Sequence, residues 1–157
     1  MNLDFSKLKV LVIGDVMLDI YLYGTSDRES PEAPIPVLVP KNEKFFLGGA
    51  GNVAMNTKAL GARVFPIGII GVDYYSQKFT DLFNKNNIET DGLIRSKKSS
   101  ITTKKRIFIN NKQILRIDND SKILKKDFDN LLLKKINRYV KNCNVIILSD
   151  YDKGVIS

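Results

Sequence analysis

Apolar and polar residues alternate along this chain in blocks that predict an α/β fold. Continuous apolar runs at 9–13, 64–70 and 145–148 are typical of strands buried on both faces of a parallel sheet. Between them, the 3.6-residue spacing of apolar positions predicts helices over 52–60, 74–84 and 127–141. The last helix has the clearest apolar stripe, made of Phe128, Leu131, Leu132, Ile136, Tyr139 and Val140.

Shorter segments with more polar residues do not fit this layer. We expect strands at 20–23, 35–39, 102–109 and 113–117, with a hairpin turn at Asn110-Asn111-Lys112. Pro34, Pro36 and Pro40 favour an edge strand in their segment, because proline cannot donate to a ladder. These strands predict a small second sheet within 20–40 and 102–118, beside a parallel core with helices on both faces.

The C-terminal segment has an unusual order. The apolar strand at 145–148 leads into Ser149-Asp150-Tyr151-Asp152-Lys153-Gly154, and the sequence stops at Ser157. A parallel strand is normally followed by a crossover that covers the sheet. We therefore expect residues 1–157 to be the N-terminal part of a longer, truncated domain.

Composition limits the available chemistry. The 157 residues are 43% hydrophobic and 27% charged, as in a soluble globular protein. No run approaches about 18 apolar residues, and the N-terminus lacks a secretory pattern, so we expect a cytoplasmic protein outside the membrane. Histidine is absent, which excludes histidine bases and ligands, and Cys143 alone can form neither an internal disulfide nor a cysteine-rich zinc site.

The net charge of +8 allows two interpretations. It could mark a nucleic-acid surface or selection for an anionic small molecule. The cations are spread over separate segments rather than gathered in one stripe, which favours the second interpretation. We therefore expect no nucleic-acid partner.

Candidate ligand-binding residues gather where strands are expected to end. Asp15 and Asp19 follow the first apolar run and Asp150 follows the last, and ligands of open α/β sheets bind beyond the carboxyl ends of strands. Gly48-Gly49-Ala50-Gly51-Asn52 leads directly into a helix, so it could be a ligand loop or a tight packing turn. Lys104 and Arg106 share one strand face, which suits a phosphate or carboxylate or simply faces solvent.

Several of these motifs together carry a family resemblance. Residues 48–54, followed by Gly61 and then by Gly68, Gly71 and Asp73, resemble the N-terminal signature of the ribokinase-like (PfkB) sugar kinases. Within that family, the segments 14–19, 28–37, 103–106, 115–118 and 148–154 are most similar to the heptose 7-phosphate kinases, including the kinase domain of bifunctional heptose kinase/adenylyltransferases.

This resemblance implies ATP-dependent phosphorylation of D-glycero-D-manno-heptose 7-phosphate at C1, in ADP-heptose and lipopolysaccharide inner-core biosynthesis. It implies sugar-hydroxyl contacts from Asp19, Gly48, Gly49 and Asn52. It also implies a β-sheet lid over the sugar that pairs with a second subunit's lid in a homodimer. Arg28, Lys104 and Arg106 become candidates for the 7-phosphate, and Asp150 and Lys153 for the junction of sugar and phosphoryl group.

The resemblance does not extend to the motifs that carry out phosphoryl transfer in this family. Ribokinase-like enzymes carry a Gly-Ala-Gly-Asp motif that supplies the base, and this motif does not occur here. They also carry an Asn-x-x-Glu motif that organises Mg²⁺; that spacing occurs here only at 86–89, well before the C-terminal half of a kinase domain. We therefore expect no catalytic residue in this chain, ATP and Mg²⁺ to bind mainly elsewhere, and no activity of this stretch alone. The alternatives are a non-catalytic sugar-phosphate-binding or dimerisation module, and a ribokinase-like kinase for another phosphorylated sugar.

Overall fold

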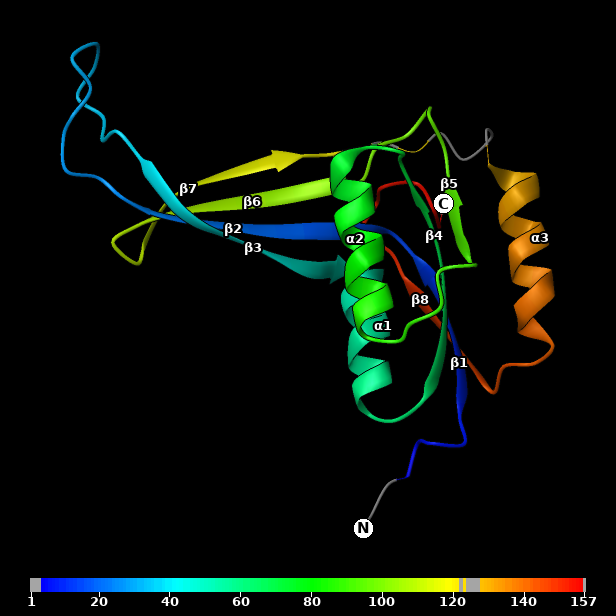
Figure 1. Ribbon diagram of the computed structural model, residues 1–157. Coiled ribbons are helices and arrows are strands. Elements are labelled where there is room, and N and C mark those ends of the chain that lie inside the picture. The colour runs from blue at the N-terminus through cyan, green and yellow to red at the C-terminus, as the bar shows by residue number, and fades with distance from the viewer. Residues whose placement is uncertain (1–3, 122, 124–127, 157) are drawn as a thin grey trace.

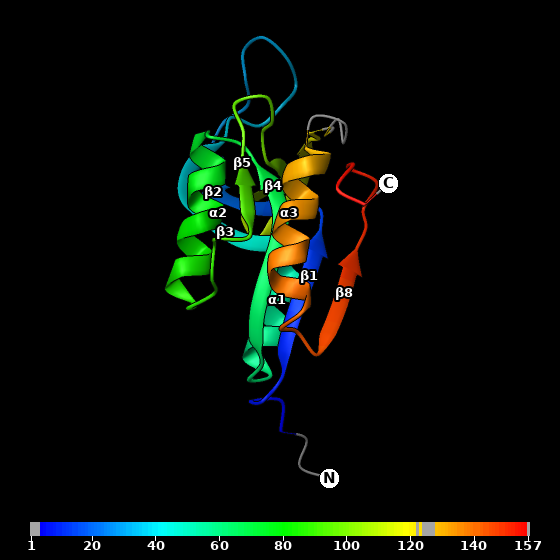
Figure 2. The same cartoon turned by 90° about the vertical axis from the view of Figure 1, so that its right-hand side faces the viewer.

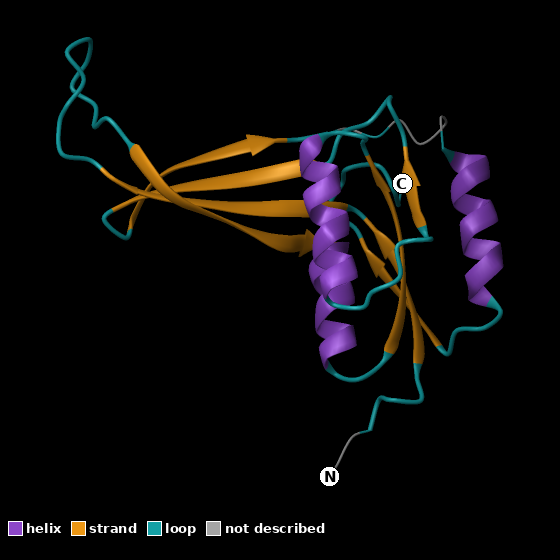
Figure 3. Ribbon diagram, viewed as in Figure 1, coloured by secondary structure: helices purple, strands orange, loops and turns teal. Residues whose placement is uncertain are grey.

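The chain folds into two four-stranded sheets, of which one forms the core and the other projects from it (Figures 1 and 3). The computed structural model describes residues 4–121, 123 and 128–156. None of the helices in these described ranges is long and apolar enough to cross a membrane.

The core sheet is parallel and has the strand order β5-β4-β1-β8. Its strands are β1 (Lys9–Gly14), β4 (Arg63–Ile70), β5 (Leu93–Arg95) and β8 (Val145–Ser149). The register pairs Leu11 of β1 with Phe65 on one side and with Ile146 on the other. The parallel sheet expected from the apolar runs is confirmed.

Helices cover both faces of this sheet, as expected (Figure 2). Val10 and Val12 of β1 pack in the cluster under α1 (Ala50–Ala59) and α2 (Tyr74–Lys85). The alternate residues Leu11 and Ile13 pack in the cluster under α3 (Asp129–Val140). This period of two places one strand's side chains in two separate cores.

Local sequence explains the start of α2. Asp73 is its N-cap and accepts the backbone N–H groups of Tyr75 and Ser76, both at 3.0 Å. Phe79 and Phe83, one turn apart, are fully buried against the sheet. The helix predicted over 74–84 is therefore confirmed to within one residue at its end.

The predicted apolar stripe of α3 is only partly buried. Phe128, Leu132 and Tyr139 are buried, but Leu131 is 51% exposed because it lies beside the face that meets β4. The predicted start at Asp127 lies outside the described residues. After α3, Cys143 is half-buried, and burial raises the pKa of its thiol.

The strand at 145–148 forms, but the prediction that it is buried is wrong. β8 is the edge strand of the core sheet and pairs only with β1 among the described residues. Val145, Ile146 and Leu148 are 40%, 48% and 63% exposed. An apolar run cannot distinguish a central strand from an edge strand, since pairing depends on distant segments.

The second sheet has the order β3-β2-β6-β7 and extends away from the helices (Figure 1). Its strands are β2 (Val16–Thr25), β3 (Val39–Gly49), β6 (Thr102–Ile109) and β7 (Lys112–Asn119). We call this sheet the lid. Asn110 and Asn111 both have positive φ, at 49° and 66°, so they form the hairpin turn expected between β6 and β7.

The expected strand at 35–39 is wrong in its bounds. Pro36 makes only an isolated bridge with Glu29, and β3 begins at Val39 and continues to Gly49. The prolines disfavour a regular strand before Val39, whereas 42–49 pair with β2 despite their polar residues. β3 is an edge strand, as the prolines indicated, and Pro40 sits where the register with β2 shifts.

Candidate functional site

The face of the lid that carries Asp19 is rich in charged and aromatic side chains. Cross-strand register places Asp19 of β2 opposite Phe46 and Lys104, and the next row joins Tyr21 to Lys44 and Arg106. Arg116 and Asp118 of β7 extend the same two rows. Four cations (Lys44, Lys104, Arg106, Arg116) share this face with two carboxylates, so the face suits an anionic ligand.

Arg106 binds Asp19 directly. Its Nη1 donates to Asp19 Oδ1 at 2.6 Å, and its guanidinium lies 5.1 Å from the centre of the Tyr21 ring. Both side chains are about a fifth exposed. The pair joins residues 87 positions apart in sequence and fixes the orientation of the Asp19 carboxylate. The structure thus brings together two predicted site residues.

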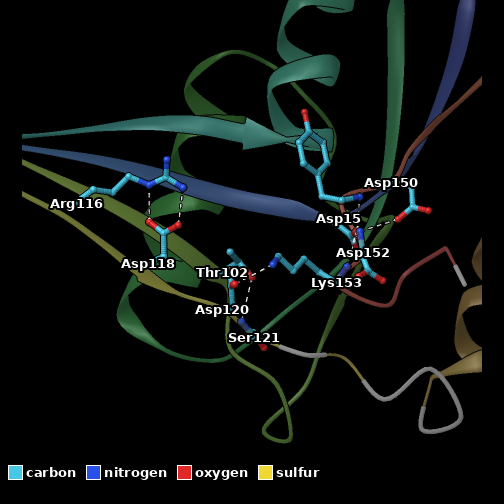
Figure 4. Close-up of polar contacts among 10 residues, drawn as sticks. Asp15, Thr102, Arg116, Asp118, Asp120, Ser121, Asp150, Asp152 and Lys153 are labelled. Carbon is cyan, nitrogen blue, oxygen red and sulfur yellow. Dashed lines mark hydrogen bonds and ion pairs between the residues drawn. The ribbon is translucent and has the colours of Figure 1, made fainter.

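Arg116 is a member of this face that sequence analysis did not single out as a ligand. It lies directly opposite Arg106 in the register. Its Nε and Nη2 donate to Asp118, the first at 2.7 Å, and this hydrogen bonding raises the pKa of Arg116 and lowers that of Asp118 (Figure 4). The period-two spacing of Arg116 and Asp118 was a signal that could have placed them on the face of Lys104.

Gly48 and Gly49 sit where β3 meets α1, beside both carboxylates. A Cβ on Gly48 would lie 2.7 Å from Asp19 Oδ2, so glycine leaves room for that carboxylate. Gly49 has φ 55° and is the N-cap of α1, and a Cβ there would lie 2.2 Å from the carbonyl oxygen of Asp15. The two glycines therefore allow the backbone to approach Asp15 and Asp19 closely.

Asp15 is buried and its carboxylate faces the segment after β8. Its oxygens accept backbone N–H groups from Tyr151, Lys153 and Val155, at 2.8, 3.1 and 3.1 Å. Asp15 is only 1% exposed. Asp15, Asp150 and Lys153, predicted from opposite ends of the sequence, thus meet at the carboxyl end of the core sheet (Figure 4).

Asp150 and Lys153 differ in their surroundings. Asp150 is exposed, and its Oδ1 accepts the N–H of Asp152 at 2.9 Å. Lys153 Nζ pairs with Asp120 Oδ2 at 2.9 Å, just after the end of β7. Lys153 therefore connects the core to the returning end of the lid.

Two predicted residues lie apart from the Asp19–Arg106 pair. Arg28 is exposed in the loop between β2 and β3, where it lines a hollow of about 450 Å³ with Ile109. Ile109 pairs with Gly24, five residues along β2 from Asp19, which is about 17 Å at roughly 3.3 Å per residue. Asn52 is exposed in the first turn of α1 and lines a different groove, of about 310 Å³, with Phe45 and Leu82.

Comparison with known proteins identifies the family. The model of the pfkB family carbohydrate kinases matches residues 7–154. The chain belongs to the pfkB family of carbohydrate kinases. The Gly-rich turn and the lid both lie within the residues that this family model matches.

Curated relatives of this pfkB chain are bifunctional proteins. The chain is 43% identical over 149 residues to "Bifunctional protein HldE" of Helicobacter acinonychis (strain Sheeba), covering 94% of this chain and 32% of the relative. It is 41% identical to the protein of the same name from Caulobacter sp. (strain K31), covering 98% of this chain and 31% of the relative. The chain thus spans about a third of the length of these relatives.

Solved structures confirm the ribokinase-like fold of the pfkB chain. A carbohydrate kinase from Agrobacterium tumefaciens superimposes with a TM-score of 0.69 at 15% identity, over 90% of this chain and 45% of that chain. Ribokinase from Arabidopsis thaliana, complexed with ribose and ATP, gives 0.63 at 14% identity, over 90% and 45%. At these identities the likeness concerns the fold alone.

Kinases of the pfkB family use ATP, typically with Mg²⁺. Across residues 4–121, 123 and 128–156, no group of three or more acidic or cysteine side chains is placed to hold a metal ion. The side chains in these described ranges therefore do not fit a Mg²⁺ site.

Proposed function

We propose that this chain is the sugar-binding part of a kinase that phosphorylates D-glycero-D-manno-heptose 7-phosphate at C1, in ADP-heptose synthesis for lipopolysaccharide. The observation that carries the proposal is the Asp19–Arg106 pair beside Gly48, at the root of a cationic lid face. A carboxylate next to cations suits a ligand with both hydroxyl groups and a phosphate. The similarity to two HldE proteins supports heptose as the sugar.

The proposed sugar contacts come from the root of the lid. Asp19 Oδ2 faces the space above Gly48 and accepts a sugar hydroxyl, while Oδ1 stays bound to Arg106. Gly48 and Gly49 supply further contacts beside the N-terminus of α1, whose dipole attracts polar oxygens. We leave Asn52 out of this sugar site because it lines a different groove. Asp150 and Lys153 lie at the junction with the transferred phosphoryl group.

The proposed 7-phosphate contacts lie one row further along the lid. Arg106 and Arg116 face each other across β6 and β7, and Lys104 lies in the adjacent row. Two opposed guanidinium groups repel each other unless an anion lies between them, and each one also binds a carboxylate here. We leave Arg28 out of this subunit's sugar site because the lid separates it from Asp19 by about five residues of strand.

In the proposed reaction the C1 hydroxyl loses its proton, its oxygen bonds to the γ-phosphorus of ATP, and ADP leaves. Asp19 and the lid hold the sugar in position, which supplies orientation rather than proton transfer. We assign no base to this chain, since the 157 residues lack the Gly-Ala-Gly-Asp motif. We therefore expect this stretch alone to bind the sugar phosphate without forming ADP.

Calorimetric binding of heptose 7-phosphate and of free heptose tests the assignment. Arg106→Ala should weaken binding of the 7-phosphate far more than that of the free sugar, but Arg106 also orients Asp19. Arg116→Ala is the cleaner probe because Arg116 does not contact Asp19. Asp19→Asn, the matched control, should weaken both ligands alike. Equal losses for both ligands in Arg116→Ala would refute the phosphate site, and tighter binding of a 6-phosphate sugar would indicate a kinase for another sugar.

We also propose that the lid pairs with the lid of a second copy. Its edge strand β7 is exposed along its whole length and carries the apolar residues Ile114, Leu115 and Ile117, each about half exposed. Covering such residues favours association. Light scattering should show a dimer for the chain and a monomer for Ile117→Asp; a wild-type monomer at high concentration would contradict the pairing.

A further inference from the structure

We propose that Asp15 is a positioning residue that acts through the segment 150–155 instead of touching the sugar. Resting on the proposed function, this inference assigns to Asp15 the task of holding Asp150 and Lys153 at the substrate site. Its evidence is independent of any ligand, because it lies in contacts within the chain.

Both oxygens of the Asp15 carboxylate accept hydrogen bonds from backbone donors. Oδ2 accepts the N–H groups of Tyr151 and Lys153, at 2.8 and 3.1 Å, and Oδ1 accepts that of Val155 at 3.1 Å. Asp15 is 1% exposed and Val155 is 2% exposed, so water has little access to these hydrogen bonds. Hydrogen bonds to a buried carboxylate are among the stronger ones in proteins.

The conformation of the segment explains why it needs an anion. Asp152 and Gly154 have φ of 57° and 102°, so left-handed residues alternate with the three donors. A backbone of alternating hand turns its N–H groups toward one point and forms an anion-binding concavity. In this protein Asp15 occupies the concavity, 136 or more residues before the donors. Without its charge, the converging N–H groups would lose the partner that holds this winding.

Backbone contacts of Asp15 extend its influence to the sugar-binding turn. Its N–H donates to the carbonyl of Ser149 at 3.1 Å, and its carbonyl accepts the N–H of Ala50 at 2.8 Å. Asp15 therefore links the end of β8 with the first residue of α1, next to Gly49. These two hydrogen bonds come from the backbone, so a substitution of the Asp15 side chain tests the three contacts of its carboxylate alone.

The same segment also determines where the lid returns to the core. Lys153 pairs with Asp120 through its side chain, and its carbonyl accepts the N–H of Ile123 at 3.0 Å. Figure 4 shows Asp15, Lys153 and Asp120 one after another in space, from the core sheet to the end of β7. Ordering of 151–155 by Asp15 thus reaches Asp120, directly after β7, the strand that carries Arg116.

Asp15→Asn tests this role, with Asp73→Asn as a matched control. Both aspartates accept backbone N–H groups, but Asp73 caps α2 and has no contact with 151–155. Each variant is compared with the wild-type chain in three measurements: melting temperature, amide hydrogen exchange at 151, 153 and 155, and affinity for heptose 7-phosphate.

We expect both variants to melt lower, but only Asp15→Asn to speed exchange at these amides. Only Asp15→Asn should also weaken binding of heptose 7-phosphate by about tenfold, the loss expected when one hydrogen bond to a charged group is lost. Equal affinity losses in both variants, or unchanged exchange in a folded Asp15→Asn, would overturn the proposal. If Asp15→Asn does not fold, wild-type exchange decides: the three amides must exchange more slowly than Asp152. If the wild-type chain does not bind heptose 7-phosphate, the proposed substrate is refuted. The hydrogen-exchange rates still test whether Asp15 orders the segment 151–155.

Discussion

Adding one methyl group at Gly48 should impair sugar-phosphate binding through Asp19. The Cβ of Gly48→Ala would lie 2.7 Å from Asp19 Oδ2 and 3.2 Å from Met17 Cβ, whereas ordinary contacts begin at 3.4 Å. Pairing with β2 holds the backbone of Gly48 in place. The Asp19 carboxylate must therefore move by about 0.7 Å to restore an ordinary contact distance. That movement stretches the 2.6 Å hydrogen bond to Arg106.

Two magnitudes follow from this displacement. A hydrogen bond between charged groups contributes roughly 1.5–3 kcal/mol, and weakening it by about half would lower the melting temperature by about 2–6 °C in a domain of this size. The same weakening of the hydrogen bond between Asp19 and a sugar hydroxyl, by about half of roughly 1.5–3 kcal/mol, should cost about tenfold in affinity.

Titration calorimetry with heptose 7-phosphate measures the affinity, and differential scanning fluorimetry measures the melting temperature. Gly68→Ala is the control, because its Cβ would meet the Val16 side chain at 2.9 Å instead of a carboxylate. The control should melt lower and keep its affinity. A folded Gly48→Ala that binds as tightly as wild type would show that Asp19 does not hold the sugar in this orientation.

Three further predictions concern other parts of the molecule. Replacing Asp73 by Ala should destabilise the chain by about 1 kcal/mol through loss of the α2 cap, as measured by urea unfolding at pH 7. Burial raises the pKa of Asp73, but hydrogen bonds from Ser76 and Tyr75 outweigh burial, so this pKa lies below 3.8. The contribution of the ionised cap to stability is therefore present above pH 3.8 and is lost as the pH falls through the lowered pKa. The unfolding free energies of wild type and variant should converge at that low pH. Asn111→Gly should raise stability by about 0.5 kcal/mol, since glycine adopts the φ of 66° more readily, and a lower unfolding midpoint would contradict this. Finally, raising the salt concentration should weaken binding of the 7-phosphate but not of free heptose, because only the former depends on the cationic lid face.

The sequence alone determined the features that depend on neighbouring residues. The run at 9–13 and the Asn110–Asn111 turn are local signals, and each formed as expected because periodicity and turn chemistry act within a few residues. The glycine signature at 48–52 also led to the family, which the comparison confirms.

Only the tertiary structure decided which strands are edges and which side chains meet. The exposure of β8 and the long pairing of β3 with β2 depend on strand order, which no apolar run encodes. The Asp19–Arg106 pair is joined across 87 residues, and Asp15 meets its donors across at least 136. A carboxylate's partner is set by register and by the conformation of a distant segment, so the sequence could name Asp15 as a candidate but could not show that its oxygens bind the chain itself.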